Sequence, residues 1–160
     1  MIKKILVAID GSRHSDKAVD MATEIAQRFG ADLVIAHSLI HGPVPQEVRK
    51  LSTEKIPEIP PMSMGGASVD YQVPRAALES IAEALLQNAS ERARASGVAN
   101  VDSQWDDGDP AQVIVGMAEK QGADLIVMGS RGLGDFKGLL MGSVSHKVQN
   151  LFDGSVLTVK

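Results

Sequence analysis

The 160-residue sequence contains no cysteine and few aromatic residues. Without cysteine, disulfides, thiol nucleophiles and thiolate metal sites are excluded. Aromatic residues make up 3% of the chain and the formal net charge is −4, so the stacking surface and basic face typical of nucleic-acid binding are missing. No apolar run is long enough to span a membrane, and the first residues lack the pattern of a signal peptide. We therefore expect a cytoplasmic protein that binds neither nucleic acid nor membrane.

Several common catalytic and nucleotide motifs are also absent. The sequence has no Gly-x-x-x-x-Gly-Lys-Ser/Thr phosphate loop and no Gly-x-Ser-x-Gly nucleophile elbow. Gly132-Leu133-Gly134 is followed by Gly138, one residue too late for the dinucleotide motif Gly-x-Gly-x-x-Gly. The four histidines are scattered, and no two share a helical face as a metal-binding pair would. These absences exclude the commonest ATPase, dehydrogenase, esterase and histidine–metal sites.

Apolar runs and helical spacing alternate along the chain. The runs that predict strands cover residues 5–9, 31–38, 98–105, 123–128 and 156–159. The spacing that predicts helices covers residues 15–29, 75–96, 110–121 and 144–151. On the first helix, we expect Ala18, Ala22, Ile25 and Phe29 to face the core. This alternation predicts a Rossmann-like α/β fold: a single open, mostly parallel five-stranded sheet with helices on both faces. The strand order that we expect for such a sheet is 3-2-1-4-5.

Residues 41–74 interrupt this alternation. They hold six of the seven prolines and the pair Gly65-Gly66, which leave room for a turn or two of helix around residues 46–51. So long a stretch without regular structure is usually a functional lid or disordered, and we favour partial disorder for this insert.

A glycine-rich connection follows the strand predicted at 123–128. It contains Gly129-Ser130-Arg131-Gly132 and, after nine more residues, Gly142-Ser143. Glycines let a phosphate approach the backbone closely, and a helix N-terminus adds partial positive charge. We expect Ser143 to cap the following helix, and Arg131 and Lys137 to add positive charge. The pattern favours an anion site for phosphate over a merely flexible loop.

Asp10 follows the first strand in the sequence Asp10-Gly11-Ser12. Ligands of an open parallel sheet bind beyond the carboxyl ends of its strands, where the strand order reverses. If the first and fourth strands are neighbours there, Asp10 faces the glycine loop and can bind ribose hydroxyls or a metal ion held by phosphates. The equally reasonable alternative is a turn aspartate that binds its own backbone.

The spacing Gly129-x-x-Gly132, nine residues, Gly142-Ser143 resembles a signature of the universal stress protein family, in its ATP-binding branch. The segments 5–12 and 123–130 are similar to that family's first and fourth strands with their turns. The resemblance covers nearly the whole chain, 1–160, except the insert at about 41–74. The sequence departs from the family at Asp153-Gly154-Ser155, where a Pro-Cys-Pro turn is frequent.

The resemblance implies an ATP site that uses Mg²⁺ or Mn²⁺. Asp10 would contact ribose or metal, and Ser38 would lie against adenine in place of a small apolar residue. The nucleotide-binding residues that the resemblance implies are Ala8, Ile9, Asp10, Ser38, Met128, Gly129, Arg131, Gly132, Gly142, Ser143 and Val144. Family members are mostly homodimers and act as nucleotide-dependent regulators.

Three functions stay open at this point. The first is an ATP-binding stress-response regulator, the second a slow ATPase or adenylyl-transferring enzyme with the same pocket, and the third a protein that has lost nucleotide binding. The intact glycines argue against the third, and the missing phosphate-loop lysine argues against the second. Because the last strand lies at an edge of the predicted sheet, with unpaired N–H and C=O groups, we also expect a homodimer through residues Ser155 to Lys160.

Overall fold

The computed structural model describes residues 1–39, 44, 46–52, 73–133 and 141–160. Most of the proline-rich insert, including Gly65 and Gly66, lies outside the described residues, as does Lys137. The strands are β1 (Lys4–Ile9), β2 (Asp32–Ser38), β3 (Val101–Asp106), β4 (Leu125–Gly129) and β5 (Ser155–Val159). The helices are α1 (Arg13–Phe29), α2 (Gln46–Arg49), α3 (Arg75–Ala95), α4 (Pro110–Gln121) and α5 (Ser143–Leu151).

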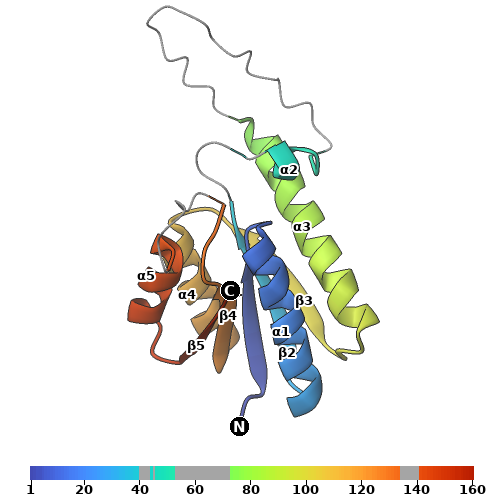
Figure 1. Ribbon diagram of the computed structural model, residues 1–160, viewed down its shortest axis with the longest axis vertical. Coiled ribbons are helices and arrows are strands. Elements are labelled where there is room, and N and C mark those ends of the chain that lie inside the picture. Colours follow the sequence, from blue (N-terminus) through green and yellow to red (C-terminus); the bar gives the residue numbers. More distant parts are fainter. Residues whose placement is uncertain (40–43, 45, 53–72, 134–140) are drawn as a thin grey trace, which may run out of the picture.

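The five strands form one parallel sheet in the order β3-β2-β1-β4-β5, which confirms the predicted fold and strand order. Helices α1 and α3 cover one face and α4 and α5 cover the other (Figure 1). β1 lies at the centre, where Ile5, Leu6 and Val7 are fully buried. Because β1 pairs with both β2 and β4, the strand order reverses beside it, and the ends of β1 and β4 share one edge.

The helix ends follow the capping residues that the sequence supplies. Ser12 caps α1, its side chain accepting the N–H of Ser15, and Asp109 caps α4 by accepting the N–H of Gln112. Gly30 and Gly122 end these helices with φ of 63° and 65°, a left-handed conformation that suits glycine.

Two expectations are wrong, one about the packing of α1 and one about the start of the third strand. Phe29 is 54% exposed, because the residue of the last turn of α1 that faces the core is Ala26, which is 1% exposed. The third strand begins at Val101 rather than Val98, because the N–H of Val98 bonds to Ala93 O and closes the end of α3. Val98 is apolar because it is buried in this turn, and that apolar character is why it was predicted to belong to the strand.

The described part of the insert contains the expected short helix, α2. Val44 and Val48 are buried there and pack with Ile81 of α3. Among the described residues, no helix combines the length and the apolar character needed to cross a membrane.

Candidate functional site

A cavity of about 370 Å³ opens at the carboxyl ends of β2, β1 and β4. All eleven residues that the sequence analysis named as nucleotide-binding line it, and their binding roles stay predictions. Six further lining residues were missed by sequence reasoning: Ser15, Leu39, Pro110, Ile114, Leu133 and Ser145. The cavity is within the size range of small-molecule and cofactor sites.

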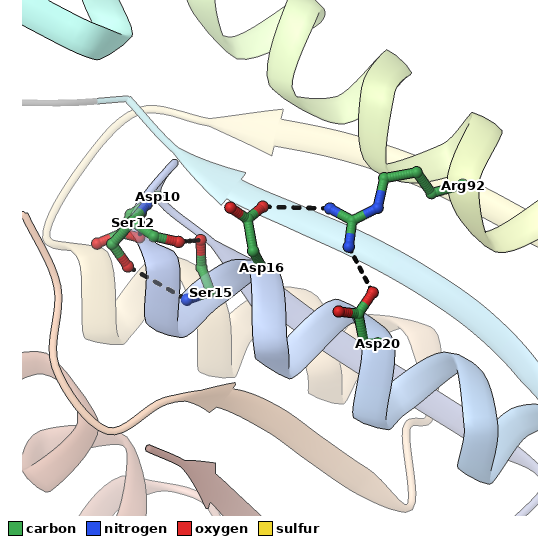
Figure 2. A network of polar contacts seen from close by, with 6 residues as sticks. All are labelled: Asp10, Ser12, Ser15, Asp16, Asp20 and Arg92. Carbon is green, nitrogen blue, oxygen red and sulfur yellow. Dashed lines mark hydrogen bonds and ion pairs between the residues drawn. The ribbon is translucent and has the colours of Figure 1, made fainter.

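Asp10 joins the end of β1 to the glycine loop after β4. Its Oδ1 accepts the N–H of Ser12 at 2.9 Å, as a turn aspartate does. Its Oδ2 accepts the N–H of Leu133 at 3.0 Å, across the point where the strand order reverses. Figure 2 shows Asp10 beside Ser12 and Ser15 at the start of α1. Asp10 therefore closes its own turn and also faces the loop, and its role toward ribose or a metal ion stays a prediction.

Two glycines of the loop lie where a side chain has no room. A Cβ on Gly129 would come within 2.8 Å of the Cβ of His14 in α1 and 3.0 Å of Arg131 O. A Cβ on Gly132 would come within 2.6 Å of Asp10 Oδ2. At Gly129 the obstructing atoms belong to α1 and to the backbone, so glycine is required for the loop to pack there. At Gly132 the obstructing atom is a carboxylate oxygen, which would have to move to admit a side chain.

The start of α5 forms the third side of the cavity. We expected Ser143 to cap this helix, but the N-cap residue is Gly142, and Ser143 is the first helical residue. The first helical bond runs from the His146 N–H to Gly142 O at 3.1 Å, so the N–H groups of residues 143, 144 and 145 precede it. No side chain caps α5, which distinguishes it from α1 and α4, and its first turn has no acidic residue. This helix end is suited to an anionic ligand.

Ser145 holds the start of α5 against the end of β4. Its Oγ lies 3.0 Å from Ser130 O and 3.0 Å from Gly142 O. Ser130 O also accepts the N–H of Gly142 at 2.7 Å, and the Ser130 N–H donates to Val159 O of β5 at 2.7 Å. The signal in the sequence was Gly142-Ser-Val-Ser145, whose second serine lies three residues before Val148 on the buried face of α5.

The side of the cavity toward β2 is mostly apolar. Pro110 and Ile114 of α4 lie there with Leu39, opposite the alanine and methionine at the ends of β1 and β4. Ser38 Oγ donates to Gly108 O at 3.4 Å, so its proton is directed to protein backbone. The cavity therefore has an apolar side near β2 and a side rich in backbone N–H near β4 and α5.

Two basic groups lie near the strand ends. Arg131 lines the cavity, and its Nε is buried with no hydrogen-bond partner among the described residues. His37 of β2 is 1% exposed, and its Nδ1–H donates to Ile9 O at 2.8 Å. Burial lowers the pKa of His37, so the imidazole is neutral at physiological pH. Within the described ranges, no three His, Asp or Glu side chains gather as a metal site would require.

The sequence and fold agree with those of a known family. The family model described as "Universal stress protein family" matches residues 1–160, which is the whole chain. The chain belongs to the universal stress protein family. The universal stress protein YxiE of Bacillus subtilis is 36% identical over 160 residues, covering all of both chains. A universal stress protein of Thermus aquaticus is 34% identical over 148 residues, covering 92% of this chain and 91% of that one.

Solved structures of universal stress proteins resemble this chain along its length. One, in complex with cAMP, has a TM-score of 0.67 and 29% identity, covering 99% of this chain and 97% of the other. Another, from Archaeoglobus fulgidus in complex with dAMP, has a TM-score of 0.61 and 23% identity, covering all of both chains. At that identity the second shows likeness of fold alone.

Proposed function

We propose that the cavity binds an adenine nucleotide, ATP above all, and that the protein is an ATP-binding stress-response regulator. One observation carries the proposal: Asp10, the glycine loop and the uncapped start of α5 converge on one cavity. Backbone N–H groups and a helix N-terminus suit phosphates, and a carboxylate suits ribose hydroxyls.

The order of the strand ends along the cavity suggests how the nucleotide is oriented in it. The base would lie toward β2, between Ser38 and the apolar residues Pro110 and Ile114. The ribose would lie at Asp10, at the end of β1. The phosphates would then reach Gly129–Gly132 and the N–H groups at the start of α5. Each part of a nucleotide meets groups of matching chemistry.

A divalent ion fits this arrangement only with the help of the phosphates. Asp10 supplies carboxylate oxygens at the cavity, and the described residues gather no set of ligands for a metal alone. Mg²⁺ is commonly held by one or two carboxylates, phosphate oxygens and water, and Mn²⁺ also accepts oxygen ligands. Bound there, the ion would neutralise phosphate charge.

The relatives support the nucleotide class. One solved universal stress protein, 29% identical to this chain, holds cAMP, which is an adenine nucleotide. We propose binding and regulation rather than rapid hydrolysis. The chain has no phosphate-loop lysine, and both carboxylate oxygens of Asp10 already accept backbone N–H groups.

Calorimetric titration with ATP, GTP and adenosine, with and without Mg²⁺, tests the proposal. We expect ATP to bind more tightly than GTP, and Asp10→Ala to weaken the binding. Asp16→Ala is the matched control, because Asp16 lies in the first turn of α1, pairs with Arg92 at 3.2 Å (Figure 2) and is not among the residues that line the cavity. No heat with millimolar ATP, or equal loss in the two variants, would contradict the proposal.

We also propose that the protein is a homodimer through β5 and the adjoining Lys160. β5 ends the sheet, and its residues are half-buried or exposed. The bond from Ser130 N–H to Val159 O shows that Val159 faces β4. In a parallel ladder the backbone groups of Val156 and Thr158 then point outward, where an antiparallel second copy can pair with them.

Thr158→Pro tests this interface, because proline removes an outward N–H without removing a bond to β4. Light scattering should show a dimeric parent, a dimeric Thr158→Val control and a monomeric Thr158→Pro variant. A monomeric parent, or a proline variant that still dimerises, would show that the interface lies elsewhere.

A further inference from the structure

Ser145 is a buried serine of α5 whose hydroxyl connects two separate parts of the backbone. It is 2% exposed, and its Oγ lies 3.0 Å from Ser130 O and 3.0 Å from Gly142 O. A bond from a helical serine to a carbonyl three residues earlier is common, but the bond to Ser130 spans fifteen residues. This second bond ties the start of α5 to the end of β4.

We propose that Ser145 is a positioning residue for the phosphate-binding part of the cavity, an inference that rests on the nucleotide-binding function proposed above. A hydroxyl carries one proton, and both polar contacts of Ser145 Oγ are to carbonyl oxygens, which can only accept. The Ser145 proton is therefore committed to protein backbone. The residue acts through the orientation of Gly142 and the N–H groups that follow, not by donating to phosphate.

The two serines at the start of α5 therefore have different roles. Ser143 is exposed and lines the cavity, and its hydroxyl can donate to a phosphate. Ser145 holds Ser130 and Gly142 at a fixed distance, so the helix end keeps its direction toward the loop. An anion site made of backbone N–H groups depends on this orientation, because hydrogen bonds weaken steeply when they are bent.

Loss of the Ser145 hydroxyl should leave the fold intact. Gly142 O still accepts the N–H of His146 at 3.1 Å, and Ser130 O still accepts the N–H of Gly142 at 2.7 Å. Neither carbonyl is left without a donor, so the usual penalty for a buried unpaired group does not arise. The Ser145→Ala variant therefore tests the positioning role of Ser145 separately from any effect on folding.

The experiment compares Ser145→Ala, Ser145→Thr and Ser143→Ala with the parent by calorimetric titration with ATP and with adenosine. We expect Ser145→Ala to weaken ATP binding about tenfold, the usual scale for one hydrogen bond, and to leave adenosine affinity unchanged. Ser145→Thr keeps a hydroxyl and should restore ATP binding. In the ligand-free proteins, hydrogen exchange at the Gly142 amide should accelerate in Ser145→Ala but not in Ser143→Ala.

Three results would overturn the inference: parental ATP affinity in Ser145→Ala, equal losses for ATP and adenosine, or unchanged exchange at Gly142. If Ser145→Thr does not fold, the exchange result and the contrast between ATP and adenosine in Ser145→Ala decide. A parent that binds no nucleotide refutes the proposed function itself, and with it the phosphate role of Ser145. That outcome is distinct from a parent that binds ATP and an alanine variant that binds it equally well.

Discussion

Gly132→Ala would bring a methyl group to within 2.6 Å of Asp10 Oδ2, and the next atom it would meet, Asp10 Cγ, is 3.8 Å away. Asp10 Oδ2 is therefore the one atom that obstructs the new methyl group. It must retreat by about 0.8 Å to reach the 3.4 Å of ordinary van der Waals contact, and that oxygen accepts the Leu133 N–H at 3.0 Å. The retreat, or an equal shift of the loop, lengthens the hydrogen bond that joins β1 to the glycine loop.

The cost follows from that bond. A hydrogen bond to a charged group contributes about 1.5 to 3 kcal/mol, and Asp10 is half-buried, so we expect the free energy of unfolding to fall by about 1 to 2 kcal/mol. Because Asp10 and the loop line the cavity together, ATP affinity should fall about tenfold, which corresponds to about 1.4 kcal/mol. Urea denaturation measures the first quantity and calorimetric titration the second.

A double-mutant cycle makes the test specific. In an Asp10→Ala background the obstructing oxygen is gone, so adding Gly132→Ala should have almost no effect on the free energy of unfolding. Gly116→Ala in α4 is the matched control, because a Cβ there meets nothing within 4 Å and should be neutral or slightly stabilising. The reasoning is refuted if Gly132→Ala keeps parental stability, or if its cost is the same with and without Asp10.

Three further outcomes follow from the structure. Burial lowers the pKa of His37 below 6.5, so the unfolded chain takes up a proton first as the pH falls, and the stability that neutral His37 confers is present above pH 6.5 and lost below it. His37→Leu should remove this slope, at most about 1.4 kcal/mol per pH unit, from urea denaturation below pH 6.5. Hydrogen bonds from the Lys3 and Lys4 N–H groups lower the pKa of Asp124 below 3.8, so its contribution is present above that pH and lost as the pH falls through the lowered value. Asp124→Asn should therefore lower the melting temperature at neutral pH, and the difference should vanish in strong acid. Gly142→Val should keep the parental circular dichroism, because φ of −76° and ψ of 160° suit valine, and should abolish ATP binding by filling space that the phosphate needs.

Two kinds of feature could be predicted from the sequence: helix ends, which depend on local backbone preferences, and the place of the ligand site on the sheet. Asp109-Pro110 and the glycines after α1 and α4 mark helix ends through their own backbone preferences, so these boundaries were predictable. Asp10 and the glycine loop were predictable as neighbours because ligands of an open parallel sheet bind where its strand order reverses, and the other lining residues at the ends of β1 and β4 came from the family resemblance.

What the sequence left undetermined depends on contacts between distant segments. The bond from Ser145 to Ser130 appears only when α5 is placed against β4, and the capping role expected of Ser143 belongs to Gly142. Likewise, Phe29 matched the apolar spacing of α1, but the packing of that helix on the sheet leaves it exposed.

Ser130 has little freedom of its own. Its N–H is fixed to Val159 of the edge strand and its C=O to Gly142 at the start of α5, both at 2.7 Å. Since peptide units are planar, only the φ and ψ of this one residue separate the two attachments. A sliding of β5 along β4 would therefore rotate the peptide that points α5 at the cavity. The edge of the sheet and the anion-facing helix end are therefore mechanically coupled through the backbone of a single residue, Ser130.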